Sequence, residues 1–256
     1  MKNNIIYEQP LNERVRTFLR LEHLFGIVNH HISQSSEWDN RTTVTMLLNI
    51  TDILSRSDIK TELIKELERH SSTLNALQTN PNVDHRRLNS ILDKINDHLG
   101  LLRDSACQPG QLLKQDELIS SIKQRSTFPG GSCNFDLPSY HFWLNQDANR
   151  KHNDLISWQN DLLIIYDSLN LTLQMLRNST SPVNERAVSG FFQKPIDPNL
   201  SCQLIRIILP KQSEYFPEIS GGKHRFTVRF MIQQKTCERP VQTKDTVEFE
   251  LHSCIL

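Results

Sequence analysis

The chain has 256 residues, and its formal charges cancel, with 29 Lys and Arg residues against 29 Asp and Glu residues. Proteins that coat nucleic acid or bind membranes through bulk charge need a net positive field, so this balance argues against both and leaves local charge recognition. With 37% hydrophobic and 23% charged residues, and only 8 Gly and 11 Pro, the composition is that of a folded protein and excludes collagen-like or low-complexity disorder.

From Leu11 to about Asn178 the hydrophobic residues recur with helical periodicity. The first predicted helix carries an apolar stripe at spacings of three and four over residues 11–32, with Pro10 at its start. Two further helices are predicted over residues 43–54 and 57–77. Each of these helices therefore has one face that must pack against a neighbour.

A fourth helix is predicted to follow a cap at Asp84 and to stop at Gly100 or soon after. Two short helices come next, one capped by Asp116 and one capped by Asp136. The last and longest helix is predicted over residues 155–176, with one gap in its apolar repeat at Gln159. Such a short repeat is typical of the seam of an intramolecular bundle.

After about Val183 the pattern becomes that of β-strands. Residues 202–210 and 225–232 are rich in branched and aromatic side chains, residues 246–252 alternate apolar with polar, and a fourth strand is predicted at 189–194. The sequence thus predicts an α+β protein: an N-terminal all-helical bundle, residues 1–183, followed by a small C-terminal antiparallel β domain, residues 184–256. A sheet this small must pack on the helices or on a second copy of itself.

The sequence contains no apolar run of the roughly 18 residues that a transmembrane helix needs, and its N-terminal apolar stretch is too short for a signal peptide. We therefore expect a cytoplasmic protein without a membrane partner. The five cysteines, Cys107, Cys133, Cys202, Cys237 and Cys254, are widely separated, and in a reducing compartment they are interpreted as small hydrophobic side chains.

Motifs for catalysis or cofactor binding are missing from the sequence. The adjacent His30 and His31 lack the spacing of a metal site, and Gly130–Gly131–Ser132 lacks the context of a nucleophile elbow. The glycines at 130 and 131 are interpreted as a loop that needs positive φ. We therefore expect no enzymatic activity, no metal and no cofactor.

Basic side chains cluster on particular elements instead. Arg16 and Arg20 lie four residues apart on the first helix, and Lys123 and Arg125 end a short helix that His141 follows. In the strand region Arg225 and Arg229 share the face opposite Phe226 and Phe230, with Arg206 expected to join them. The alternative is that these arginines are solvated or paired with Glu248 and Glu250 across strands.

Four long segments carry a resemblance to a known family. They are PLNERVRTFLRLEHLF (10–25), DIKTELIKELERH (58–70), QDELISSIKQRSTFPGGSCNFDLPSYHFWL (115–144) and YFPEISGGKHRFTVRFM (215–231). In this order and spacing they resemble the ZapD family of bacterial cell-division proteins over essentially the whole chain. The resemblance implies a non-enzymatic homodimer, joined through its β domain, that binds the C-terminal tail of FtsZ and bundles FtsZ filaments at the mid-cell division ring.

The resemblance also implies which side chains bind the tail. The family's pocket positions fall on Arg20 and His141, with Arg16 one turn away on the helix of Arg20. A third, usually basic position is Glu117 here, and either Lys114 one turn earlier replaces that charge or the pocket is weaker. Arg225 and Arg229 match family arginines that either contact FtsZ or stabilise the sheet.

The alternative to FtsZ binding is a function of a different class. The chain could instead be a helical regulatory or nucleic-acid-associated adaptor that uses the face of Arg225 and Arg229. That function predicts polynucleotide binding with a steep dependence on salt, whereas tail binding needs only a local basic pocket.

Overall fold

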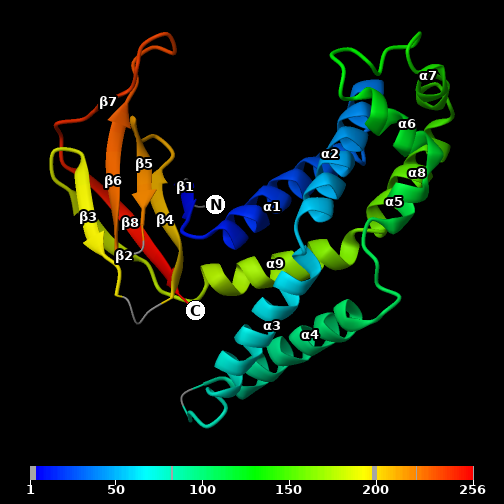
Figure 1. Ribbon diagram of the computed structural model, residues 1–256. Helices are drawn as coiled ribbons and strands as arrows, with labels where there is room; N and C mark the ends of the chain where they lie inside the picture. The colour runs from blue at the N-terminus through cyan, green and yellow to red at the C-terminus, as the bar shows by residue number, and fades with distance from the viewer. Residues whose placement is uncertain (1–3, 82, 198–200, 223, 256) are drawn as a thin grey trace. The chain divides into compact units, whose positions relative to one another are not determined.

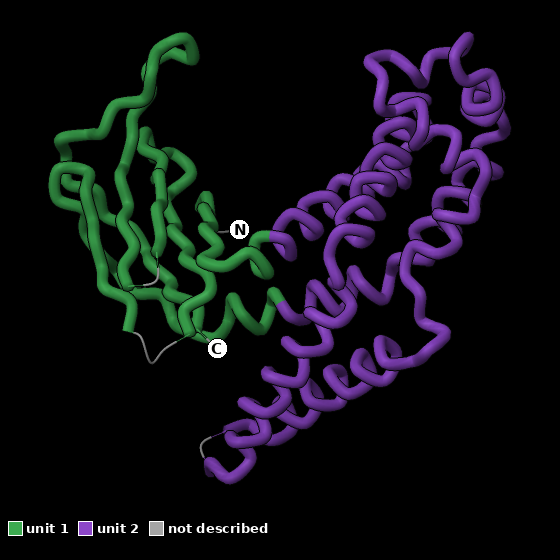
Figure 2. Tube along the Cα trace, in the orientation of Figure 1, with its two compact units in different colours: residues 1–16, 173–256 green, residues 17–172 purple. Residues whose placement is uncertain are grey.

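The computed structural model describes residues 4–81, 83–197, 201–222 and 224–255. The chain divides into two compact units, one formed by residues 1–16 and 173–256 and the other by residues 17–172 (Figure 2). We call the first the strand unit and the second the helical unit. The model confirms the α+β class, with helices in the N-terminal part and antiparallel strands toward the C-terminus (Figure 1).

The helices follow one another along most of the chain, and α1 and α9 continue across the division between the units. In order they are α1 Glu13–His31, α2 Glu37–Arg56, α3 Ile59–Asn75, α4 His85–Arg103, α5 Gln111–Gln115, α6 Glu117–Arg125, α7 Pro138–Leu144, α8 Ala148–Asn160 and α9 Leu163–Arg177. Helices α3 and α4 pack side by side as a hairpin (Figure 1).

Side-chain caps explain where several helices begin. The expected caps Asp84 and Asp116 accept hydrogen bonds from the first turns of α4 and α6. Ser36 caps α2 by accepting from the backbone N–H of Asp39, so this helix begins earlier than its apolar stripe predicted. The stripe of α1 is buried as predicted, with Val28 and Leu21 fully inaccessible.

One helix ends as predicted and another does not. α4 ends at Arg103, soon after Gly100, which is not among the glycines with positive φ. The last helix is not continuous, because residues 161 and 162 form a turn that separates α8 from α9.

The strands form two antiparallel four-stranded sheets rather than the one small sheet that was predicted. The strands are β1 Asn4–Pro10, β2 Val183–Ala187, β3 Phe191–Pro195, β4 Cys202–Pro210, β5 Tyr215–Gly221, β6 Arg225–Ile232, β7 Val241–Gln242 and β8 Val247–Ile255. One sheet has the order β1-β4-β8-β2, and the other has the order β3-β6-β5 with β7 paired to β6.

The two sheets enclose a common hydrophobic core. Its buried members come from both sheets: Ala187, Ile205, Ile207, Leu209, Phe226, Val228, Phe230, Val247, Phe249 and Leu251. Each sheet thus buries one face against the other, which is the arrangement of a β-sandwich.

The N-terminal segment belongs to this sandwich. Residues 1–183 were predicted to form the helical domain, with helical periodicity from Leu11, but Asn4–Pro10 forms an edge strand whose Glu8 lies opposite Arg206 of β4. The strand unit therefore contains both ends of the described chain, and the helical unit lies between them in sequence.

Candidate functional site

Helix α7 presents two chemically different faces. Tyr140, Trp143 and Leu144 are buried, whereas His141 is exposed and Phe142 is 66% exposed. Pro138 occupies the first turn, where its fixed φ suits a helix. Asp136 was expected to cap this helix, but its Oδ2 instead accepts a hydrogen bond from Cys133 Sγ at 3.2 Å.

The buried face of α7 rests on an aromatic cluster. The ring of Trp143 lies 5.9 Å from that of Tyr140 and 5.5 Å from that of Trp158 on α8, measured between centroids. Trp143 Nε1 donates to Asp154 at 2.8 Å, and Trp158 Nε1 donates to Asp116 at 3.1 Å. These contacts fix α7 so that His141 and Phe142 point away from the packed interior.

The loop between α6 and α7 depends on two glycines. Gly130 has a φ of +75°, which confirms the expected use of positive φ. Gly131 has an ordinary φ, but a Cβ there would lie 2.3 Å from the carbonyl oxygen of Arg125. The tight turn thus returns the chain against the end of α6.

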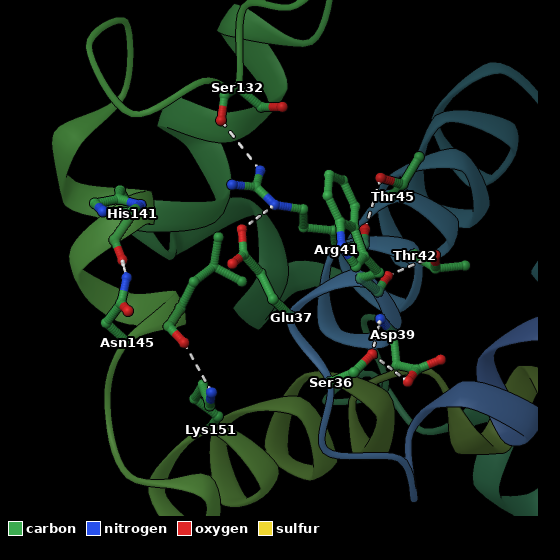
Figure 3. Close-up of polar contacts among 12 residues, drawn as sticks. Ser36, Glu37, Asp39, Arg41, Thr42, Thr45, Ser132, His141, Asn145 and Lys151 are labelled. Atoms are coloured by element: carbon green, nitrogen blue, oxygen red, sulfur yellow. Dashed lines mark hydrogen bonds and ion pairs between the residues drawn. The ribbon is translucent and has the colours of Figure 1, made fainter.

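Arg41 of α2 forms a hydrogen bond with the same loop (Figure 3). Its Nη1 donates to the carbonyl of Ser132 at 3.1 Å, and its Nε donates to Glu37 at 2.9 Å. The guanidinium also lies over the rings of Tyr140 and Trp38, 5.0 and 5.8 Å from their centroids. Burial, opposed in part by Arg41, raises the pKa of Tyr140 above its ordinary range, so its hydroxyl stays neutral.

An open hollow of about 420 Å³ lies beside the exposed face of α7. Its walls are formed by Asn134, Phe135, Pro138, His141, Phe142 and Asn145. Phe135 is 80% exposed. We call the exposed side chains of Phe135 and Phe142 the aromatic surface, and His141 lies beside it.

Basic residues predicted for the site lie on the neighbouring helices. α6 packs against α5, α7 and α2, which brings the elements of Lys114, Lys123, Arg125 and His141 together. Lys123 is engaged by Asp52 of α2 at 2.6 Å. Lys114 and Arg125 are exposed and form no ion pair within the described residues, and Glu117 is exposed on the first turn of α6.

The two predicted arginines of α1 differ in their surroundings. Arg20 is exposed and has no ion pair among the described residues. Arg16 is half-buried, and its Nε lies 3.2 Å from Glu13 Oε1. Of the two, Arg20 offers the freer charge to a partner.

Arg225 and Arg229 lie on the outer face of β6, as predicted, because Phe226 and Phe230 point into the sandwich core. Arg229 pairs in register with Glu218 of β5. The expectation that Arg206 joins them was wrong, because Arg206 lies in the other sheet, where its Nε donates to Glu8 at 2.8 Å. Pairing with Glu248 or Glu250 was equally wrong, because both lie on β8 of that other sheet.

The described residues contain no group of three or more His, Cys, Asp or Glu side chains that could hold a metal ion. Burial raises the pKa of Cys202 to about 11 and that of Cys254 to about 12, so both thiols stay protonated. Among the same residues no helix is long and apolar enough to cross a membrane.

No sequence pattern singled out the aromatic surface. Phe135 lies in a loop rich in Gly, Pro and Ser, where no periodicity could assign it to a core. That placement was the available signal, because a large aromatic side chain in a polar loop is often either a packing anchor or a binding residue.

Comparison with known proteins identifies the family. The model of the ZapD family, described as "Cell division protein", matches residues 19–229. A cell division protein ZapD from Methylococcus capsulatus (strain ATCC 33009 / NCIMB 11132 / Bath) is 42% identical over 256 residues and covers the whole of both chains. Another from Azoarcus sp. (strain BH72) is 36% identical over 252 residues, which are 98% of this chain and 100% of the relative.

A third relative extends the comparison. The cell division protein ZapD of Coxiella burnetii (strain RSA 331 / Henzerling II) is 35% identical over 251 residues, covering 98% of this chain and 97% of the relative. All three are named as cell division proteins and not as enzymes. The chain therefore belongs to the ZapD family of cell division proteins and has a role in cell division.

Proposed function

We propose that this protein binds the C-terminal tail of FtsZ and, as a homodimer, crosslinks FtsZ filaments into bundles that promote and stabilise the Z-ring. It acts in the cytoplasm at the mid-cell division ring. The observation that carries the proposal is the exposed His141 beside the aromatic surface, with Lys114 and Arg125 on neighbouring helices. Membership of the ZapD family supports the same conclusion.

The combination of side chains suits a short peptide with acidic and apolar residues. Aromatic and Arg side chains are enriched among the residues that dominate binding energies at protein interfaces. Local positive charge attracts an acidic segment even though the whole chain has a formal net charge of zero. A polymer presents many tails, so two weak sites on one dimer act together through effective concentration.

Exposed apolar side chains of the strand unit support the dimer. Val188 is 67% exposed, Phe191 is 41% exposed, and the two form a bridge in the turn before β3. Gln242 Nε2 donates to the carbonyl of Ser189 at 2.9 Å, which joins this turn to β7, where Val241 is 60% exposed. We propose that Val188, Phe191 and Val241, the turn patch, contribute to the dimer interface.

The decisive experiment is sedimentation of FtsZ polymers with and without their C-terminal tail. We expect the protein to pellet with intact polymers and to stay in the supernatant with tail-less ones. Arg20→Ala and His141→Ala should each reduce pelleting at low salt while the dimer persists, and Arg150→Ala, which removes an exposed arginine of α8, is the control. Unchanged bundling by Arg20→Ala would remove Arg20 from the site, and equal pelleting of tail-less polymers would refute tail binding.

A further inference from the structure

Lys151 of α8 is a buried cation whose charge has no acidic partner. Its residue is 8% exposed, and its Nζ donates to the carbonyl of Leu144 at 2.8 Å (Figure 3). Within the described ranges no carboxylate forms an ion pair with it, and burying a charge is costly unless it is neutralised. An ammonium has three donors, so the single carbonyl leaves two of them available.

Lys151 is one of the residues that line a cavity of about 260 Å³. It lies between the α1–α2 loop, α2 and the start of α8, and its polar wall includes Ser33, Ser35, Asn40, Asn149, Lys151 and His152. Ala148 and Asn149, in the first turn of α8, also line it, which adds the positive end of a helix dipole.

Asn40 supplies a second, independent indication of a ligand. It is 2% exposed, and its Nδ2 has no hydrogen-bond partner among the residues that the structure covers. A buried amide donor without an acceptor is unfavourable, so Asn40 favours a ligand with an acceptor atom, and the ammonium of Lys151 favours one that also carries negative charge.

The nearby carboxylates are already engaged and do not line the cavity. Asp39 Oδ1 lies 2.6 Å from Nδ1 of His31, and its Oδ2 accepts from Ser36 Oγ at 2.5 Å. The hydrogen bond to Ser36 and the contact with His31 keep the pKa of Asp39 below its usual value. Asp147 Oδ1 accepts the backbone N–H of Asn149 at 2.9 Å.

We propose that this cavity binds a small oxyanion, a phosphate or a carboxylate, with Lys151 and Asn40 as its principal donors. The cavity is smaller than the ~300–1,000 Å³ of pockets for drug-sized ligands, so it suits a single anionic group rather than a nucleotide. The site is independent of the proposed tail binding. It is linked to α7, which carries His141, because Lys151 bonds the last residue of that helix.

The test is a titration with inorganic phosphate at constant ionic strength, followed by amide NMR of the whole chain. We expect saturable shifts of the Asn40 side-chain amide and of the backbone at 148–152. Lys151→Met should weaken phosphate binding by about tenfold or more, since a charge-assisted hydrogen bond contributes at least that factor. Arg150→Gln, next in sequence but outside the cavity wall, should bind phosphate as the native chain does.

A second variant decides the question if Lys151→Met does not fold. Gln34 is exposed and lines the cavity, so Gln34→Glu adds a negative charge there without changing the size of the side chain. We expect it to lose phosphate binding. A parallel titration with acetate distinguishes a preference for phosphate from one for carboxylate. Non-saturable shifts with both anions, or binding by Gln34→Glu that equals that of the native chain, would overturn the proposal.

Discussion

Arg41 is the side chain that joins α2 to the loop preceding α7, and its replacement should loosen that loop. Arg41→Ala removes the donors to Ser132 and Glu37 and the contact with the Tyr140 ring. We expect a loss of about 1.5–3 kcal/mol in the free energy of unfolding, the range for hydrogen bonds to charged groups. Urea denaturation measures the loss, and hydrogen exchange at residues 130–136 should become faster.

Arg41→Lys is the informative companion variant, because it keeps the charge but cannot bond two acceptors in one plane. It should recover only part of the lost stability. If Arg41→Ala leaves both stability and loop exchange unchanged, the loop is held by its glycine turn alone.

His252 of β8 should make the strand unit sensitive to acid. It is 9% exposed, and within the described part of the chain neither ring nitrogen has a hydrogen-bond partner. Burial lowers its pKa, Arg206 adds to the decrease, and Glu250 partly offsets it. The unfolded chain therefore binds the proton more readily than the folded one, so stability is complete above pH about 6.5 and falls as the pH decreases below that value.

The free energy of unfolding would be measured by urea denaturation at one pH above and one pH below about 6.5. His252→Leu should flatten the pH dependence, because the leucine cannot be protonated. His85→Gln changes an exposed histidine at the start of α4 and should leave the slope as it is. An equally steep slope in His252→Leu would assign the acid sensitivity to other groups.

At the scale of elements, the turn between α8 and α9 carries Asp161, which caps the neighbouring helix α5. α5 follows Gly110, which has a φ of +80° and no side chain with which to cap the helix. Asp161 Oδ2 instead accepts from the backbone N–H groups of Leu112 and Leu113, at 2.9 and 3.3 Å. Asp161→Ala should cost about 0.5–2 kcal/mol, as loss of a helix cap does.

The effect should be local to α5. Amides of residues 111–115 are expected to exchange faster in Asp161→Ala, while those of α6, which has its own cap at Asp116, keep their rates. Asp161→Asn retains an acceptor oxygen, so its exchange rates at residues 111–115 should lie between those of Asp161→Ala and those of the native protein. Uniform acceleration over all helices would mean that Asp161 acts on the whole unit.

Local patterns explain which elements could be predicted. The stripe of α1 and the alternation of β6 follow from residues near one another in sequence, and both are buried as expected. Helix α8 could not be separated from α9, because the partner of Asp161 lies almost fifty residues away. Strand β5 was not predicted, although its Pro217 is compatible with a strand at the edge of a sheet, where β5 lies.

Ion pairs between residues far apart in sequence join the N-terminal strand β1 to the rest of the strand unit. Glu8 accepts from Arg206 Nε at 2.8 Å and from Arg177 Nη2 at 2.7 Å, and all three side chains are largely shielded from solvent. Glu8→Gln removes the carboxylate that the guanidinium groups of Arg206 and Arg177 share. We expect a loss of about 1–3 kcal/mol in urea denaturation.

Glu248→Gln provides a matched control for this change. Its pair with Arg186 joins neighbouring strands of the same sheet, but both side chains are more than 70% exposed, at 73% and 71%. Exposed pairs contribute about 0–1 kcal/mol, so this variant should stay near the native stability. Equal losses in the two variants would show that shielding does not determine the strength of these pairs.

At the scale of the whole molecule, the proposed tail binding depends on local charge, and the proposed bundling depends on two copies of the chain. The sequence could indicate basic residues such as Arg20 and His141, but not the exposure of Phe142, because that depends on which face of α7 packs inward. If recognition is local and crosslinking requires two copies, then binding to FtsZ polymers and bundling of them should be separable by substitution.

Val241→Asp should separate them. It places a charge in the turn patch, and at 60% exposure the valine contributes little to the core. We expect a monomer in analytical ultracentrifugation that still pellets with FtsZ polymers at high speed, but with an apparent affinity lower by roughly 10²–10⁴, the gain that bivalency gives. Low-speed pelleting, which reports bundles, should be lost. Val183→Asp changes a similarly exposed valine of β2 and should remain a bundling dimer, so loss of the dimer in both variants would place the interface elsewhere in the strand unit.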